Sequence, residues 1–482
     1  MKKSLTKNYI YNLLYQILKV LLPVITTPYI SRVLGAKNIG IYSYTLSISA
    51  VFILFGSLGI ELYGQREIAY QQDETEKYSK TFWEILIFRF ISMTFSLLVF
   101  YFAFVYTNNV YSTYYKILMF EIIGNMFDIS WFFQGLEEFK KTVSRNFLVK
   151  IISVACIFMF VKTKNDLSIY FLIYVFSLLL GNLSLWFYLP KYLTKVKKLN
   201  IIKHLKPTLL LFIPQIAMQI YTILDKTMLG TIIADKSEVG YYDQSQKIIK
   251  TLLALVTSLG IVMMPRIAST FAKKDNEKIK KYLSKSFSLT FCISIPMIFG
   301  IFAVSDIFVP IFFGRGYDKV ALLMKAISPI FLFIGMSNII GNQYLLPTKR
   351  QNEFTVSVIV GAVVNFCMNS ILIPKYQALG ASIGTVIAEF SVTLTQLIFV
   401  RKSLEIKEII ILCKNYVFSS IIMFLVCIIV SKVINNNFIS LFVQIIAGVI
   451  VYYAMLILLK DKFVHEITNK IVKKLKLNKG AK

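Results

Sequence analysis

The 482-residue chain is too apolar and too poor in charge for an ordinary soluble protein, with 56% hydrophobic and 16% charged residues. Soluble domains usually hold about 45–50% apolar and 25% charged residues. The apolar residues gather in blocks of about 20, the length of a helix that crosses roughly 30 Å of hydrocarbon. Apolar runs such as residues 421–430 exclude a β-barrel, whose strands alternate apolar and polar residues. We therefore expect an all-α integral membrane protein.

Fourteen apolar blocks follow one another along the chain and predict fourteen transmembrane helices. In the first two-thirds, the expected spans are 10–30, 39–62, 82–106, 114–135, 143–161, 167–189, 208–231 and 245–264. In the remainder, they are 283–305, 320–343, 354–373, 378–400, 412–432 and 438–459. The first block has no clear small-residue cleavage site and is longer than a typical signal-peptide core, so we expect it to be retained.

The formal charge of +28 is distributed asymmetrically around these spans. With the N-terminus inside, the eight cytoplasmic segments carry 37 of the 53 Lys and Arg residues, whereas the seven outer segments carry 11. This bias follows the positive-inside rule, so most of the basic residues encode orientation. We expect both termini to be cytoplasmic, membrane lipid to be a partner of the basic loops and nucleic acid not to be a partner.

The chain also resembles itself at an offset of six spans. The pair LG at 34–35 recurs at 229–230, an offset of 195 residues. IGIY at 39–42 corresponds to VGYY at 239–242, an offset of 200, and SLGI at 57–60 recurs at 258–261, an offset of 201. An even offset places both copies in the membrane with the same orientation, as parallel repeats. The predicted divisions are an N-lobe (1–190), a basic cytoplasmic linker (191–207), a C-lobe (208–402), and a final helix pair with a basic tail (403–482). Two such lobes suit alternating access by rocking.

Ionisable side chains within the predicted spans are candidate functional groups, because a charge in hydrocarbon is costly and usually faces protein or a wet cavity. Most of them are cations, which we expect to attract a phosphate or diphosphate group. Lys19, near the bilayer midplane in the first span, is the foremost candidate. The other candidate cavity cations are Arg32, Arg89, Lys226, Lys250 and Lys325. The alternative is that they balance acidic residues or extend to the membrane surface.

Three acidic residues, Glu121, Asp128 and Asp225, are candidates for ion coupling or for structural roles. Glu121, Asn125 and Asp128 fall on one face of the fourth span, which should line the interior of the N-lobe. Asp128 and Arg89 lie at similar depths in consecutive spans, which favours a structural salt bridge. Asp225 lies directly beside the candidate Lys226.

The alternative to a transport function is an enzymatic one, as in a membrane glycosyltransferase or polymerase. The predicted loops are about 20 residues or shorter and carry no DxD pair, glycine-rich phosphate loop or HExxH site. We expect His204 and His465 to lie at the surface, and the five cysteines to be small core residues. No catalytic residue, cofactor or metal site is therefore expected.

Several segments carry a family resemblance when they are taken together and in order. They are residues 23–69, DISWFFQGLE at 128–137, DKTMLG at 225–230, VGYY at 239–242, MPR at 264–266 and LGASI at 379–383. This set resembles bacterial polysaccharide flippases, the Wzx-like members of the multidrug, oligosaccharidyl-lipid and polysaccharide (MOP) exporter superfamily. The resemblance covers residues 1 to about 400. The last two spans match the family only in number.

The resemblance implies a two-lobed, MATE-like fold in the bacterial cytoplasmic membrane. It also implies movement of an undecaprenyl-diphosphate-linked oligosaccharide to the outer leaflet, for capsule, exopolysaccharide or O-antigen synthesis. Coupling to H⁺ or Na⁺ is a further implication, with Asp128 or Glu121 as the coupling site. A peptidoglycan-precursor (lipid II) flippase would have the same topology and a similar cavity, and a multidrug exporter would have a more acidic or aromatic one. Both alternatives stay open.

Overall fold

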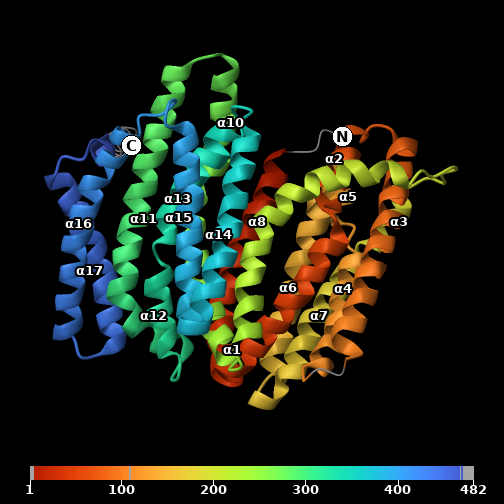
Figure 1. Ribbon diagram of the computed structural model, residues 1–482, viewed down its shortest axis with the longest axis horizontal. Coiled ribbons are helices and arrows are strands. Elements are labelled where there is room, and N and C mark those ends of the chain that lie inside the picture. The colour runs from red at the N-terminus through yellow and green to blue at the C-terminus, as the bar shows by residue number, and fades with distance from the viewer. Residues whose placement is uncertain (1–4, 108–109, 467, 470–482) are drawn as a thin grey trace, which may run out of the picture. The chain divides into compact units, whose positions relative to one another are not determined.

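The described part of the chain is built from helices alone and contains no strand (Figure 1). The computed structural model describes residues 5–107, 110–466 and 468–469. Within these ranges, only the backbone is described at positions 5–21, 139, 213–215, 217–218, 220–221, 259, 261–262, 406–408 and 410. The prediction of an all-α chain is confirmed.

The chain divides into two compact units, Met1–Gly240 and Tyr241–Lys482, which we call unit 1 and unit 2. The division lies within helix α9 (Ser237–Thr257), after α8 (Leu205–Ile232), whereas the predicted lobes divide before α8. That earlier boundary comes from the internal repeat, so the lobes remain a prediction. Each unit is described by itself below.

Unit 1 consists of helices that follow one another through short connections. They are α1 (Leu5–Ser57), α2 (Ile60–Tyr70), α3 (Thr75–Phe100), α4 (Ser112–Met126), α5 (Ser130–Gly135), α6 (Phe139–Phe160), α7 (Leu167–Ser184), α8 (Leu205–Ile232) and the start of α9 (Ser237–Thr257). Short segments of other helical geometry are η1 (Tyr101–Val105), η2 (Lys164–Asp166), η3 (Trp186–Lys191) and η4 (Ile202–His204). Helix α1 packs on α3, α4, α6 and α8, and α4 packs on α7.

Two glycines mark breaks in the first helices of unit 1. Within α1, Gly35 has φ 75° and ψ 166°, a conformation that glycine adopts readily, so two helices meet at this residue. Gly59, at φ 72°, lies in the short break between α1 and α2. The second SLGI sequence, at 258–261, also meets a break, because α9 ends at Thr257 and α10 begins at Leu259.

The predicted span 114–135 is wrong as a single helix. Helix α4 ends at Met126 and α5 begins only at Ser130. The Asp128 carboxylate accepts a hydrogen bond from the Ser130 amide at 2.8 Å, a local bond that competes with helical pairing. At 15 residues, α4 is about 22 Å long, shorter than the hydrocarbon core.

Ten helical segments of the described residues are long and apolar enough to cross a membrane. They are Leu22–Tyr70, Thr75–Val105, Lys140–Phe160, Lys164–Lys191, Asn276–Phe313, Asp318–Leu345, Gln351–Tyr376, Ala378–Val400, Ile411–Val433 and Asn437–Leu458. The second predicted span and the end of the first, from Leu22, fall in one 49-residue segment, and spans 114–135, 208–231 and 245–264 are not among the ten. A multi-pass membrane chain is thus confirmed, while the count of fourteen remains a prediction.

Unit 2 holds the rest of α9 and the helices that follow it. They are α10 (Leu259–Ala272), α11 (Asn276–Phe313), α12 (Asp318–Ile327), α13 (Ile330–Ser337), η5 (Asn338–Leu345), α14 (Gln351–Tyr376), α15 (Ala378–Val400), α16 (Ile406–Val433) and α17 (Asn437–Leu458). Helices α14 and α15 pack side by side, as do α16 and α17, the blue pair in Figure 1. Cys427 is buried, as expected for a core residue, whereas Cys367 is exposed.

The segment predicted as a cytoplasmic linker, 191–207, folds back onto α2 and α3 of unit 1. The Thr194 amide donates a hydrogen bond to Ser79 at 3.1 Å, and the Asn200 amide donates to Glu84 at 2.7 Å. At its end, His204 contacts both Tyr63 and Glu84, at 2.7 Å and 3.1 Å. The segment is therefore bound to the helices along its length.

The prediction that His204 lies at the surface is wrong. Its side chain is only 2% exposed, because Glu84 in α3 and Tyr63 in α2 supply buried polar partners for the two ring nitrogens. Burial disfavours the charged imidazolium and lowers the pKa of His204 below its ordinary value. His465, in contrast, is exposed, as predicted.

Candidate functional site

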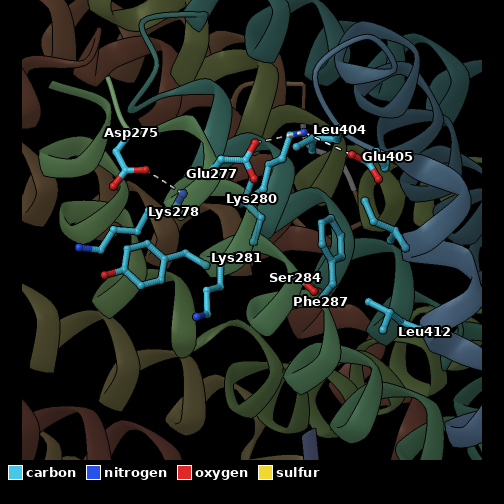
Figure 2. A pocket seen from close by; sticks show the side chains of 13 residues that line it. Asp275, Glu277, Lys278, Lys280, Lys281, Ser284, Phe287, Leu404, Glu405 and Leu412 are labelled. Atoms are coloured by element: carbon cyan, nitrogen blue, oxygen red, sulfur yellow. Dashed lines mark hydrogen bonds and ion pairs between the residues drawn. The ribbon is translucent and has the colours of Figure 1, made fainter. Parts of the chain in front are cut away.

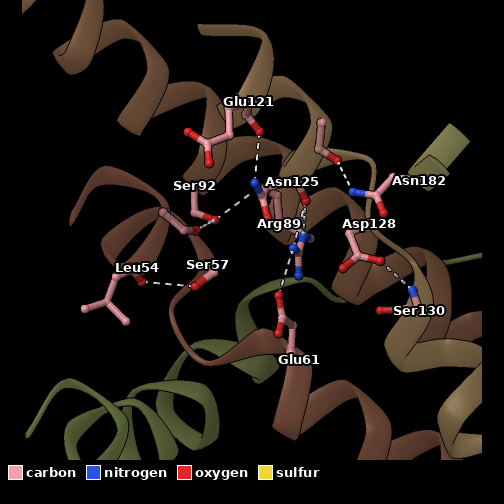
Figure 3. A network of polar contacts seen from close by, with 12 residues as sticks. Leu54, Ser57, Glu61, Arg89, Ser92, Glu121, Asn125, Asp128, Ser130 and Asn182 are labelled. Atoms are coloured by element: carbon pink, nitrogen blue, oxygen red, sulfur yellow. Dashed lines mark hydrogen bonds and ion pairs between the residues drawn. The ribbon is translucent and has the colours of Figure 1, made fainter. Parts of the chain in front are cut away.

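Arg89 lies on α3, and its completely buried side chain reaches the C-terminal end of α4 (Figure 3). Its Nε and Nη2 atoms donate hydrogen bonds to the Asn125 carbonyl oxygen at 3.0 Å and 2.7 Å. Nη2 also lies 3.3 Å from Glu61. The guanidinium thus adds charged donors to a carbonyl at the helix end that also accepts a hydrogen bond from the Asp128 amide at 3.2 Å. Two of the three guanidinium nitrogens are therefore bound within unit 1, and contact of Arg89 with a ligand remains a prediction.

The predicted salt bridge between Arg89 and Asp128 is wrong. The cation pairs with Glu61, and the Asp128 carboxylate accepts a hydrogen bond from the Ser130 amide (Figure 3). The reason is the helix break after Met126, which removes Asp128 from the helical face on which its position was predicted.

The other acidic residue of this face, Glu121, is held inside unit 1. It is 5% exposed and accepts hydrogen bonds from Ser49 of α1 at 2.6 Å and from Tyr174 of α7 at 2.9 Å. The Asn125 side chain donates to the Glu121 carbonyl oxygen at 2.9 Å. The prediction that the polar stripe of α4 faces the interior is therefore correct for Glu121 and Asn125.

An open cavity of about 520 Å³, with many polar side chains in its lining, lies against this network, and we call it the unit 1 cavity. It is lined by residues of α1, α4, α5, α6 and α7 and of the break between α4 and α5. Its polar lining is Thr26, Tyr42, Asn125, Asp128, Ser130, Arg145, Asn146, Lys150, Ser153, Tyr170, Tyr174, Ser177 and Asn182. Tyr174 belongs both to the cavity wall and to the Glu121 network. Asp128 is the one candidate site residue in this lining.

Two cations of the unit 1 cavity, Arg145 and Lys150, were not among the candidates. They lie near the start of α6, at the cytoplasmic end of the predicted span 143–161, and the charge distribution counts them with the loop before that span. Arg145 donates hydrogen bonds to the side chains of Asn146 and Asn182 at 3.0 Å and 2.9 Å, which hold the guanidinium against α7. A signal was present in the sequence, because Asn146, Lys150 and Ser153 follow one another at i, i+4 and i+7 on one helix face.

Two of the candidate cations near the start of each lobe, Arg32 and Lys226, do not line the unit 1 cavity. The side chain of Lys19 is outside the described residues. Arg32 is exposed on α1, and Lys226 is half-buried on α8 beside the buried Asp225. Their contact with a ligand therefore remains a prediction.

The candidate cations of unit 2 are also spread apart along the chain. Lys250 is exposed on α9. Lys325 of α12 forms an ion pair with Asp306 of α11 at 2.6 Å, which matches the alternative that some cations balance acidic residues. A common cavity for these cations likewise stays a prediction.

A second cavity, of about 830 Å³, lies in unit 2 where α11 and α16 begin (Figure 2). Lys280 lies 3.3 Å from Glu405 and 3.8 Å from Glu277. In total, its lining contains the three acidic residues Asp275, Glu277 and Glu405 and the three lysines Lys278, Lys280 and Lys281. Because these charges balance, the cavity favours neither sign of ligand, and the unit 1 cavity is the better candidate.

Two family models match the chain. The model described as "Polysaccharide biosynthesis protein" matches residues 5–271, and the model "Lipid II flippase MurJ" matches residues 151–449. The chain is 27% identical to the "Putative O-antigen transporter" of Escherichia coli K12, over 83% of this chain and 98% of that protein. It is 21% identical to "Capsular polysaccharide biosynthesis protein CapF" of Staphylococcus aureus, over 83% of this chain and all of that protein.

Solved structures share the fold. The "Lipid II flippase MurJ, inward closed conformation" matches with a TM-score of 0.74 at 17% identity, covering 94% of this chain and 99% of that one. An inward-facing multidrug resistance MATE transporter matches with a TM-score of 0.63 at 11% identity, covering 82% and 95%. The expected MATE-like fold is therefore confirmed. The chain belongs to the polysaccharide biosynthesis protein family, as a Wzx-like, multi-pass flippase of the MOP superfamily.

Proposed function

We propose that this flippase moves undecaprenyl-diphosphate-linked oligosaccharide units across the bacterial cytoplasmic membrane, for capsule, exopolysaccharide or O-antigen synthesis. The observation that carries the proposal is the match over 98% of a protein named as a putative O-antigen transporter. The full-length match to a capsular polysaccharide biosynthesis protein supports the same class of cargo. A transport role, without enzymatic chemistry, follows from this assignment.

The unit 1 cavity supplies chemistry that suits such a headgroup. Arg145 and Lys150 can donate charge-assisted hydrogen bonds to phosphate oxygens. Hydroxyl and amide side chains, such as Ser153, Tyr170 and Asn146, match the hydroxyl groups of sugars. The lipid tail meanwhile stays in the bilayer, so that the polar headgroup avoids most of the cost of entering hydrocarbon.

The proposed topology has fourteen spans, cytoplasmic termini and two parallel six-span lobes. The break at Gly35 supports it, because it divides the 53 residues of α1 into two helices. A reciprocal contact supports the repeat. A Cβ atom on Gly40 would lie 1.6 Å from the Lys236 carbonyl oxygen, and one on Gly240 would lie 2.1 Å from the Ala36 carbonyl oxygen. Both partners are related by the same offset of 200 residues.

Alternating access coupled to H⁺ or Na⁺ is the proposed mechanism. Asp128 lines the unit 1 cavity, and Glu121 is joined to its wall through Tyr174, so these two carboxylates are the proposed coupling groups. Asp225, buried on α8, is the third candidate. The cations Lys19, Arg32, Arg89, Lys226, Lys250 and Lys325 are proposed to contact the diphosphate along its path.

A lipid II flippase is the second candidate function, because the MurJ model matches residues 151–449. Complementation of two flippase-deficient bacterial strains distinguishes the two functions. Rescue of surface polysaccharide in a strain that lacks its own repeat-unit flippase supports the first proposal. Rescue of growth in a strain depleted of its lipid II flippase, without restored polysaccharide, overturns it in favour of the second. A multidrug exporter fits less well, since cavity cations repel cationic drugs.

A variant test addresses the cavity itself. In the double variant Arg145→Gln, Lys150→Gln, we expect at least about a tenfold loss of lipid-linked sugar reaching the outer leaflet, because two charged donors are removed. The control is Lys116→Gln, which removes an exposed lysine on α4 outside the cavity and should leave export unchanged. Undiminished export by the double variant at equal protein levels contradicts the cavity assignment.

A further inference from the structure

A long apolar groove runs along the outer surface of unit 1 between α6 and α7, with a volume of about 910 Å³. One wall is a row on α6 in which an apolar residue recurs every four positions: Leu148, Ile152, Cys156 and Phe160. The opposite wall consists of Leu172, Phe176 and Leu180 of α7. Large apolar side chains are exposed here, with Ile152 at 51% and Leu180 at 62%, so the groove faces the lipid.

One end of this α6–α7 groove is basic. Lys140, Lys141 and Arg145 line it, and none of the described residues in its lining is acidic. Lys141 lies over the Tyr192 ring at 3.9 Å and is 4.0 Å from Glu138 just outside the lining. The unit 2 cavity, with its balanced charges, lacks this polarity. The basic end therefore favours a phosphate group.

The length of the groove restricts the chain that can fill it. From Lys140 to Phe160, α6 rises about 30 Å, the full thickness of the hydrocarbon core. A phospholipid acyl chain fills only one leaflet, roughly half of that distance. A polyprenyl chain of many isoprene units can extend along the whole groove from a phosphate at its basic end.

The groove and the unit 1 cavity share a wall. Arg145, Val149, Ile173 and Ser177 line both of them. Ser153 donates a hydrogen bond to Ser177 at 2.7 Å across the two helices. A phosphate at Arg145 would thus contact a residue that lines both the groove, which suits a lipid tail, and the cavity, which suits a polar headgroup.

We propose that the α6–α7 groove binds a long-chain polyprenyl phosphate, with the phosphate on Lys140 and Arg145 and the chain along the rows of Leu148 and Leu172. In naming the carrier lipid, this inference rests on the proposed function. It adds a binding site for the lipid part of the cargo on the outer face of unit 1.

Photo-crosslinking on the full-length chain in lipid nanodiscs tests the site. The photoreactive residue p-benzoyl-phenylalanine is incorporated at Ile152 in the groove, or at Phe95 on α3 as a matched control. Phe95 is also exposed, at 70%, but lies outside the groove. With labelled undecaprenyl phosphate as the probe, we expect several-fold more crosslinking at position 152. Equal labelling at both positions overturns the proposal.

Competition identifies the ligand. Unlabelled undecaprenyl phosphate should suppress crosslinking at position 152, whereas undecaprenol and phosphatidylglycerol should not at the same concentration. Equal suppression by phosphatidylglycerol overturns the proposal in favour of a general anionic-lipid site. Equal suppression by undecaprenol shows that the basic end does not recognise phosphate and overturns it as well.

Charge variants give a second measurement. Lys140→Gln should weaken undecaprenyl phosphate binding about tenfold through the loss of a charged donor. Lys197→Gln, at an exposed position outside the groove, should not weaken it. Equal affinities of both variants contradict the proposal. Binding in the groove without any export of lipid-linked sugar would contradict the proposed function but not this inference. Export without binding in the groove would contradict this inference but not the proposed function.

Discussion

At the scale of single residues, Arg89 illustrates how a buried charge stabilises a helix end. Its guanidinium donates two hydrogen bonds to the Asn125 carbonyl oxygen, near the end of α4. A cation at this end also interacts favourably with the helix dipole. Glu61, the acidic partner, remains 58% exposed, so the ion pair itself contributes less than these bonds.

Replacing Arg89 should therefore destabilise the fold. For Arg89→Leu, we expect a loss of about 1–3 kcal/mol, because the Asn125 carbonyl oxygen loses both charged hydrogen bonds and keeps only the one from the Asp128 amide. In Asp128→Asn, the side-chain oxygen can still accept the hydrogen bond from the Ser130 amide, so the melting temperature of this variant should change little. Thermal unfolding of the purified protein in detergent measures both. A loss for Asp128→Asn as large as that for Arg89→Leu would support the salt bridge that the structure lacks.

His204 should make stability depend on pH. Since its pKa is lowered in the folded chain, the unfolded chain binds the proton more readily. The stabilising effect is therefore present above the unfolded pKa of about 6.5 and is lost as the pH falls toward the folded value. We expect the melting temperature to fall between pH 7.5 and pH 5, and to fall less in His204→Gln. The exposed His465→Gln is the control, and identical pH profiles for all three proteins contradict this role.

Sequence reasoning located buried charges at this scale but not their partners. The depths of Arg89 and Glu121 follow from their positions in apolar blocks. The partner of Arg89 depends on where α4 ends, which is set by a local bond at Asp128 and was not predicted. Likewise, the burial of His204 depends on Glu84, a residue 120 positions away in the chain.

At the scale of helices, the breaks follow short sequences that were recognised as repeated. The two SLGI sequences coincide with the break between α1 and α2 and with the break between α9 and α10. Predicted span 320–343 is also divided, into α12 and α13, at Ser328 and Pro329. Ser328 keeps helical dihedral angles, but Pro329 has no backbone N–H to donate to the carbonyl four residues before it, and this missing bond explains the break. Apolar length alone predicts the blocks but not these interruptions.

The close approach at Gly40 gives a test at this scale. In Gly40→Ala, the new Cβ atom would overlap the Lys236 carbonyl oxygen, so that the backbone has to shift. We expect a destabilisation of at least about 1–3 kcal/mol. Gly300→Ala in α11 is the matched control, because nothing lies within 4 Å of its Cβ position, and alanine favours a helix by up to about 1 kcal/mol. An unchanged melting temperature for Gly40→Ala contradicts the close contact.

At the scale of the whole molecule, composition and charge distribution predicted the helical membrane class, and motif order predicted the family. The cavity could not be predicted in the same way, since its lining combines residues of α1, α4, α5, α6 and α7, which come together only in the folded chain. In the sequence, Arg145 and Lys150 look like the many other basic residues that follow the positive-inside rule. Their special position becomes visible only through contacts such as that between Arg145 and Asn182.

The proposed fourteen-span topology predicts the side on which each segment lies. A green fluorescent protein fused after Lys482 should fluoresce, as it does in the cytoplasm. Alkaline phosphatase fused after Lys164 should be active, and the same enzyme fused after Lys197 should be inactive. An odd number of spans would place the C-terminal fusion outside and abolish fluorescence. Active phosphatase at Lys197 would contradict the predicted orientation.

The segment 191–207 joins α7 to α8 in a way that restricts both. It is held to α3 through Ser79 and Glu84 and to α2 through Tyr63, and α8 begins directly after His204. No slack remains between the last of these attachments and α8. The segment thus acts as a strap rather than a flexible tether, so displacement of the start of α8 must either pull α2 and α3 with it or break the hydrogen bonds at Glu84 and Tyr63.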